Sequence, residues 1–153
     1  MNEKTLKIGE LLVEGGRLSA DQAQEVLAHQ RRRSVPFGVL AERMFGVSVG
    51  SVEEAWVEQY HRATGTLTLR GVEPEPEALA LLHRRQAHQF RMVPLRFEPD
   101  GALLIAACRS RLARAVTFAA HRVPSPAHFR VAACGPLDEL LDRCYPAALR
   151  CAG

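Results

Sequence analysis

The hydrophobic pattern in the first third of the chain is written twice. The apolar and polar positions of residues 7–30 recur 29 residues later, over residues 36–59, with a five-residue spacer between the copies. The matched pairs include Gly9 with Gly38, Leu27 with Trp56, and Gln30 with Gln59. A repeat of this length normally duplicates one supersecondary unit so that two apolar faces bury each other. We therefore expect two helix-turn-helix units packed together, with Gly9 and Gly38 in equivalent surroundings and two equivalent edges open to a ligand or partner.

Glycine, serine and proline predict where the four helices of this repeat begin and end. Glycines are expected to end the first and third helices, and serines to cap the second and fourth. Pro36 can begin the third helix because its missing N–H is not needed there. The predicted ranges are roughly 8–14, 19–33, 36–46 and 48–65, with Ser48 or Ser51 as the last cap.

The period of the pattern changes after Gly65. Thr66 to Leu69 alternates like a strand, and Pro99-Asp100-Gly101 between two apolar runs is a hairpin signal. The expected elements are a strand at 66–69, a helix at 78–89, strands at 92–97 and 103–107, a helix at 110–121, a strand at 129–132 and a helix from Pro136 to Tyr145. We predict an α+β chain. A duplicated four-helix subdomain (residues 1–65) is followed by a small βαββαβα subdomain (residues 66–153).

Composition narrows the class of protein only slightly. Of 153 residues, 47% are hydrophobic and 24% charged, with a net charge of +3, all ordinary for a globular protein. Arginine clusters such as residues 31–33 are typical of solvated faces, so we do not expect nucleic-acid binding. No stretch reaches the ~20 apolar residues of a membrane-spanning helix, and the N-terminus lacks the apolar core of a secretion signal. We expect a cytoplasmic protein without membrane insertion.

The four cysteines predict neither a metal site nor a disulfide. Cys108, Cys134, Cys144 and Cys151 are widely spaced, without a Cys-x-x-Cys pair or a histidine at ligand spacing. In the cytoplasm we expect them to be reduced, with Cys108 and Cys134 as small apolar strand residues.

Motifs for catalysis are missing from the sequence. It has no Gly-x-x-x-x-Gly-Lys-[Ser/Thr] phosphate loop and no Ser/His/Asp or Cys/His arrangement. We therefore expect a non-catalytic protein without a cofactor.

The doubled motif and two later segments resemble a known family. The first copy begins Lys7-Ile8-Gly9 and ends at Gln30, and the second begins Pro36-Phe37-Gly38 and ends at Gln59. With Phe90-Arg91-Met92-Val93-Pro94-Leu95 and Leu103-Leu104-Ile105-Ala106-Ala107, they resemble the MshEN domain. This domain is the N-terminal module of the ATPases that drive type II secretion and type IV pilus assembly.

The resemblance implies two roles, docking on an inner-membrane platform protein and, in a subset of members, binding cyclic di-GMP. The family's ligand motif begins Arg-Leu-Gly and ends in Gln. Carried over with the apolar walls beside it, the candidate ligand-binding residues are Lys7, Ile8, Gly9, Leu12, Gln30, Pro36, Phe37, Gly38, Ala41 and Gln59. The leading arginine is replaced by Lys7 and Pro36, which removes the guanidinium fork that binds phosphate and guanine.

Plainer interpretations exist for the same residues. Gly9 and Gly38 also fit a role in close helix packing alone, and Gln30 and Gln59 also fit solvated or capping positions. Our first functional hypothesis is an adapter that binds a platform protein or a separate ATPase of a secretion or pilus machine. The alternative is a cyclic di-GMP receptor, and a nucleic-acid binder ranks last.

Overall fold

The computed structural model describes residues 7–147, which form two compact units that divide between Ala63 and Thr64. The predictions for the N-terminal segment and for Cys151 lie outside the described residues. Within residues 7–147, none of the helices combines the length and the apolar character needed to cross a bilayer. Each unit is described separately below.

Four helices make up the first unit, as predicted. They are α1 (Ile8–Glu14), α2 (Ala20–Arg32), α3 (Phe37–Phe45) and α4 (Val49–Thr64). Ser19 Oγ accepts a hydrogen bond from the Gln22 amide at 3.1 Å, which caps α2. Ser48 Oγ accepts from the Ser51 amide at 3.1 Å, so Ser48 is the cap of α4.

The core of the first unit joins both repeats. Its buried members are apolar residues from all four helices and their turns: Leu11, Leu12, Leu18, Ala23, Ala41, Val47 and Ala55. Because neither helix pair is large enough to bury its apolar stripe alone, each repeat completes the core of the other.

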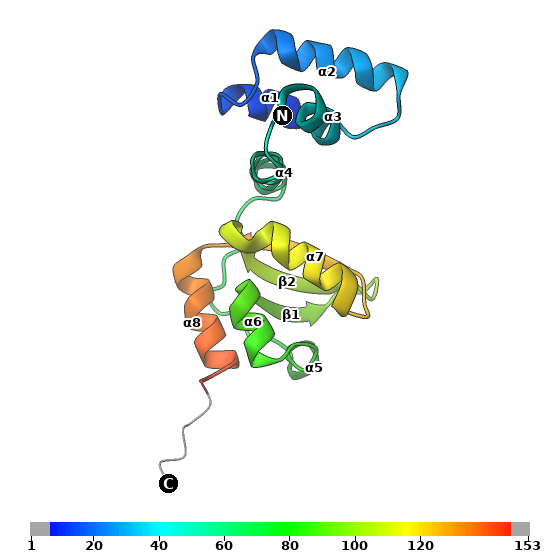
Figure 1. The fold of residues 1–153 in the computed structure, drawn as a ribbon. Coiled ribbons are helices and arrows are strands. Elements are labelled where there is room, and N and C mark those ends of the chain that lie inside the picture. Colours follow the sequence, from blue (N-terminus) through cyan, green and yellow to red (C-terminus); the bar gives the residue numbers. More distant parts are fainter. Residues whose placement is uncertain (1–6, 148–153) are drawn as a thin grey trace. The chain divides into compact units, whose positions relative to one another are not determined.

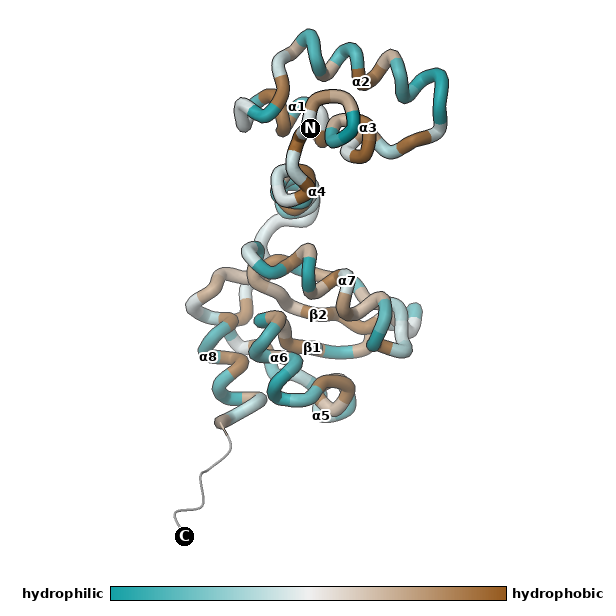
Figure 2. The backbone as a smooth tube through the Cα atoms, in the orientation of Figure 1, coloured by the Kyte–Doolittle hydropathy of each residue, from teal (hydrophilic) through white to brown (hydrophobic). Residues whose placement is uncertain are grey.

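A three-stranded mixed sheet forms the centre of the second unit. Strand β1 (Met92–Phe97) pairs antiparallel with β2 (Leu103–Cys108), and β2 pairs parallel with β3 (Ala127–Ala132). Every residue of β2 is buried, and Figure 2 shows this strand as largely hydrophobic. The predicted hairpin is confirmed: Gly101 has φ +85°, and Asp100 Oδ1 accepts a hydrogen bond from the Ala102 amide at 2.9 Å.

Helices cover this sheet. They are α5 (Pro76–Leu79), α6 (Arg84–Phe90), a 3-10 turn η1 (Arg109–Arg111), α7 (Leu112–Arg122) and α8 (Cys134–Cys144), shown in Figure 1. Helix α7 packs on β2 and β3, whereas α8 packs on β1 and β2. The predicted α+β class is confirmed, with four helices followed by a small mixed sheet and interleaved helices.

The predicted strand at 66–69 is wrong. The segment makes one isolated bridge, between Thr66 and Val131, and the Leu67 amide donates to the Val131 carbonyl at 2.7 Å. It then turns away, because the Val72 amide donates to the Leu69 carbonyl at 3.1 Å and Gly71 adopts φ +75°. The second unit therefore contains three strands among its described residues rather than four.

The predicted helix at 78–89 is two helices. The first ends at Leu79, and the second starts after His83, whose amide donates to Gln86 Oε1 at 3.0 Å. The polar run His83 to Gln86 interrupts the apolar stripe, so no single face continues through both halves. Helix α8 also begins two residues before Pro136, at Cys134.

The cysteines differ from expectation. Cys108 at the end of β2 and Cys134 at the start of α8 form a disulfide, with a Cα–Cα distance of 5.6 Å. The expectations that both are reduced and that Cys134 lies in a strand are therefore wrong. The return of the chain from β3 into α8 brings the two residues together, and their spacing in sequence does not reveal this.

Polar contacts hold α8 to the rest of the second unit. Arg91 Nη2 donates to Asp138 Oδ1 at 2.6 Å, and this hydrogen bond raises the pKa of Arg91. Tyr145 Oη donates to the Leu79 carbonyl at 2.6 Å, and burial raises the pKa of Tyr145. These bonds connect the middle of α8 to Arg91, which lies between α6 and β1, and the C-terminal end of α8 to α5.

Candidate functional site

Two cavities open on the first unit. The larger has a volume of about 660 Å³ and is built mainly by α1 and α2; we call it the first cavity. The smaller has a volume of about 320 Å³ and is built mainly by α3 and α4; we call it the second groove.

The two sites are equivalent under the 29-residue offset of the repeat. Nine positions of the first repeat line the first cavity, and their nine counterparts line the second groove. The pairs are Lys7/Pro36, Ile8/Phe37, Gly9/Gly38, Glu10/Val39, Val13/Glu42, Ala20/Val49, Ala23/Val52, Gln24/Glu53 and Leu27/Trp56. Phe37 also lines the first cavity, and Ile8 also lines the second groove. The residue before the glycine of each motif therefore contributes to the sites of both repeats. The duplicated sequence thus builds a duplicated site.

The first cavity gathers most of the predicted site residues. Six of the ten candidates line it: Lys7, Ile8, Gly9, Gln30, Phe37 and Gln59. Pro36 and Gly38 line the second groove instead. Leu12 and Ala41 line neither site, because they are 1% and 0% exposed and belong to the core.

Further lining residues were not predicted. Helix α2 contributes Ala20, Ala23, Gln24 and Leu27, which share one helical face with Gln30. The spacing of this face was visible in the sequence as the i, i+3, i+4, i+7 pattern. An apolar stripe of this spacing does not distinguish a core face from a cavity wall.

Two polar contacts shape the first cavity. Gln30 Nε2 donates to the Val35 carbonyl in the spacer at 3.3 Å, so Gln30 also holds the turn between the repeats. The Lys7 amide donates to Glu10 Oε2 at 3.3 Å, which satisfies a free N–H at the start of α1. None of the spacer arginines 31–33 is among the residues that line the cavity.

Gly9 and Gly38 border corresponding sites, but their nearest neighbours differ, contrary to the expectation of equivalent surroundings. A Cβ on Gly9 would lie 2.8 Å from Phe37 Cζ in the other repeat. A Cβ on Gly38 would lie 2.6 Å from Val52 Cγ1 in its own repeat. Both glycines therefore serve close helix packing, the plainer of the two interpretations, while both also border a site.

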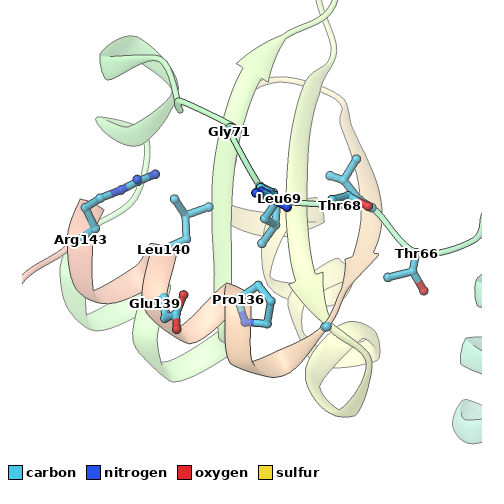
Figure 3. Close-up of a pocket in the computed structure, with 11 residues that line it drawn as sticks. Thr66, Thr68, Leu69, Gly71, Pro136, Glu139, Leu140 and Arg143 are labelled. Atoms are coloured by element: carbon cyan, nitrogen blue, oxygen red, sulfur yellow. The ribbon is translucent and has the colours of Figure 1, made fainter.

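The second unit has a cavity of its own, of about 590 Å³ (Figure 3). The extended segment from Thr66 to Gly71 forms one wall and α8 forms the other. Arg143 on α8 is already engaged, since its Nη2 donates to the Val72 carbonyl at 3.2 Å. No residue predicted from the sequence as a site residue lines this cavity. Across residues 7–147, no group of three or more His, Cys, Asp or Glu side chains is placed to hold a metal ion.

Comparison with known proteins identifies relatives of both units. Residues 62–150 match the family model of the MshEN domain. The chain is 31% identical over 147 residues to the type IV pilus assembly ATPase PilB of Thermus thermophilus. That alignment covers 94% of this chain and 16% of PilB, so the chain spans about a sixth of the length of this relative.

Two solved structures align with most of the chain, and the first of them shows the same fold. A structure of MshE with cdg (cyclic di-GMP) aligns with a TM-score of 0.50 at 21% identity, covering 92% of this chain and 99% of that one. The N-terminal domain of XpsE aligns with a TM-score of 0.48 at 22% identity, covering 94% and 98% of the two chains. The family model and the alignment with PilB confirm the resemblance to the MshEN domain, and the chain belongs to the MshEN domain family.

Proposed function

We propose that the chain is a non-catalytic regulatory module of a type IV pilus or type II secretion machine and acts as an adapter between proteins. The alignment with PilB carries this proposal. It is long enough to include both units, and this relative is an assembly ATPase of the type IV pilus.

Direct binding tests the adapter role. The purified full chain is titrated against the purified motor ATPase and against the cytoplasmic domain of the platform protein of the same machine, with biolayer interferometry as the readout. Saturable binding to one of the two is expected. Absence of binding to both, with a folded chain, contradicts the proposal.

The first cavity favours cyclic di-GMP binding as a second candidate function. Its volume of about 660 Å³ falls within the usual range for small-molecule sites, and both repeats contribute to its lining. MshE has been solved with cyclic di-GMP. At 21% identity that structure carries over the fold alone, so the argument has to come from the chemistry of this cavity.

The side chains of the first cavity suit parts of a cyclic dinucleotide. Lys7 supplies a positive charge for a phosphate, and Gln30 and Gln59 supply amides that can hydrogen-bond guanine. Phe37 and Leu27 supply an apolar wall for the bases. One lysine faces a ligand with two phosphates, and a lost charge-assisted contact costs roughly 1.5–3 kcal/mol. We therefore expect weaker binding than a site with two arginines would give.

Calorimetry with cyclic di-GMP on the full chain tests this second function. Heat of binding is expected for the wild type and should be lost in Gln59→Ala. Gln89→Ala is the matched control, because Gln89 is exposed on α6 in the other unit. No heat with the wild type, or equal heat with Gln59→Ala, removes the receptor function and leaves the adapter function standing.

A further inference from the structure

The two equivalent sites of the first unit have diverged in chemistry. The first cavity is lined by one cation, Lys7, and one anion, Glu10. The described lining of the second groove contains two anions, Glu42 and Glu53, and no cation. Their counterparts in the first repeat are the uncharged Val13 and Gln24. Corresponding residues of the two repeats therefore line sites that differ in charge, and the second groove is the negative one.

Three apolar side chains of the second groove are larger than their counterparts in the first cavity. Ala20, Ala23 and Leu27 of the first repeat correspond to the larger Val49, Val52 and Trp56. Val49 is 59% exposed, and among residues 7–147 Phe97 is the other large hydrophobic residue with an exposed side chain. Trp56 is half-buried beside it and stacks on Tyr60 with ring centroids 5.6 Å apart. The groove therefore combines one exposed apolar side chain with half-buried ones such as Val52 and Trp56, and an apolar patch with a polar border is typical of a protein interaction site.

The negative border excludes one class of occupant and selects another. Glu42 and Glu53 repel a phosphate group, so the second groove is unsuited to the dinucleotide chemistry of the first cavity. The same carboxylates attract lysine and arginine. An apolar floor with acidic edges fits a helix whose apolar stripe is bordered by basic residues, docked through anchors at i, i+3 or i+4, and i+7.

We propose that the second groove is a docking site for a basic amphipathic helix of a protein partner, while the first cavity keeps the small-molecule role. This inference rests on the proposed adapter function, because it names the surface through which the adapter binds. The first copy of the motif would then bind a small molecule, and the second copy would bind a protein partner.

Trp56 provides a direct readout, since it is the only tryptophan in the chain. The probe is an alanine-based helical peptide with leucines at i, i+4 and i+7 and arginines beside them. A control peptide carries glutamates in place of the arginines. Titration of the arginine peptide into the full chain should shift the Trp56 emission and saturate, whereas the glutamate peptide should bind at least several-fold more weakly. Equal binding of both peptides, or no change in Trp56 emission with either, overturns the proposal.

Two variants test whether the peptide binds in the second groove. Val49→Ser removes an exposed apolar contact and should lower the affinity for the arginine peptide about fivefold to tenfold. Glu53→Lys should reverse the preference toward the glutamate peptide. Gln24→Lys is the matched control, because it makes the same charge at the equivalent position of the first repeat and should leave the preference unchanged. An equal effect of Gln24→Lys and Glu53→Lys contradicts docking in the second groove.

The outcomes separate this inference from the adapter function. If a machine protein binds the wild type and Val49→Ser equally, the groove is rejected and the adapter remains. If the arginine peptide binds at Trp56 but neither machine protein binds, the groove remains and the adapter assignment fails. A concentration-dependent dimer in sedimentation that is lost in Val49→Ser makes a second copy the occupant and overturns the proposal.

Discussion

The ring of Phe37 lies so close to Gly9 that a Cβ on this glycine would be 2.8 Å from Phe37 Cζ. The two residues belong to different repeats, and both line the first cavity. The absence of a side chain at Gly9 therefore lets the second repeat approach the first closely enough to share one site.

Replacing Gly9 by alanine should destabilise the first unit by about 1–3 kcal/mol, because the added methyl group forces Phe37 to shift in a packed position. Gly50→Ala is the control. Gly50 lies in α4, and a Cβ there would meet nothing within 4 Å, so the helix should gain up to about 1 kcal/mol. Urea unfolding followed by circular dichroism measures both variants. If Gly9→Ala were as stable as Gly50→Ala, the contact between the repeats would not constrain the fold.

Lys7→Arg should strengthen cyclic di-GMP binding by about tenfold, because a guanidinium adds planar stacking and paired hydrogen bonds to the charge that lysine already provides. Lys7→Met, which keeps length without charge, should weaken it. Calorimetry on the full chain measures both affinities. Unchanged affinity in Lys7→Met would place the phosphates of the ligand away from Lys7.

Reduction of the Cys108–Cys134 disulfide should destabilise the second unit by about 3 kcal/mol, since the bond closes a loop between residues 26 apart. Thermal unfolding with and without reductant measures the loss, and Cys134→Ser should reproduce it. Cys144→Ser is the control, because Cys144 is a free thiol and its removal should leave the response to reductant intact. A reductant effect that persists in Cys134→Ser would assign it to another cysteine.

Tyr145 should make the second unit sensitive to alkaline pH. Burial raises the pKa of Tyr145, so the folded state holds the phenol proton more tightly than the unfolded state, whose pKa is about 10. The resulting stability is fully present below pH 10 and is lost as the pH rises toward the folded pKa. Tyr145→Phe should lose about 1 kcal/mol at neutral pH with its bond to Leu79, and should lose less on going above pH 10.

Cys144 complicates this measurement, because burial also raises its pKa. The comparison is therefore made in a Cys144→Ser background, by urea unfolding at several pH values. Parallel loss of stability in the phenylalanine and tyrosine proteins would show that another group titrates.

Local patterns in the sequence were sufficient for most of the elements. Apolar spacing, Ser19, Pro36 and the Pro99-Asp100-Gly101 turn determine helices and the hairpin through contacts between near neighbours. The same reasoning wrongly predicted a strand from Thr66 to Leu69. Alternation makes a strand possible, but pairing depends on a neighbouring strand, and β3 offers this segment a single bridge.

The division of the binding site also depended on tertiary contacts. The sequence displayed both copies of the motif, but it did not show that Gln59 joins the first cavity while Pro36 joins the second groove. The pairing of Cys108 with Cys134 likewise depends on the packing of β2 against α8, which the sequence spacing does not predict.

The sequence by itself therefore determined that two copies of one helical unit precede a small α+β unit, because periodicity and capping act over a few residues. Only the tertiary structure decided which residues of the two copies share a cavity, since that depends on how closely Gly9 and Phe37 allow the helices to approach. The physical reason is that a site is made of side chains distant in sequence, whose meeting is set by packing rather than by local preference.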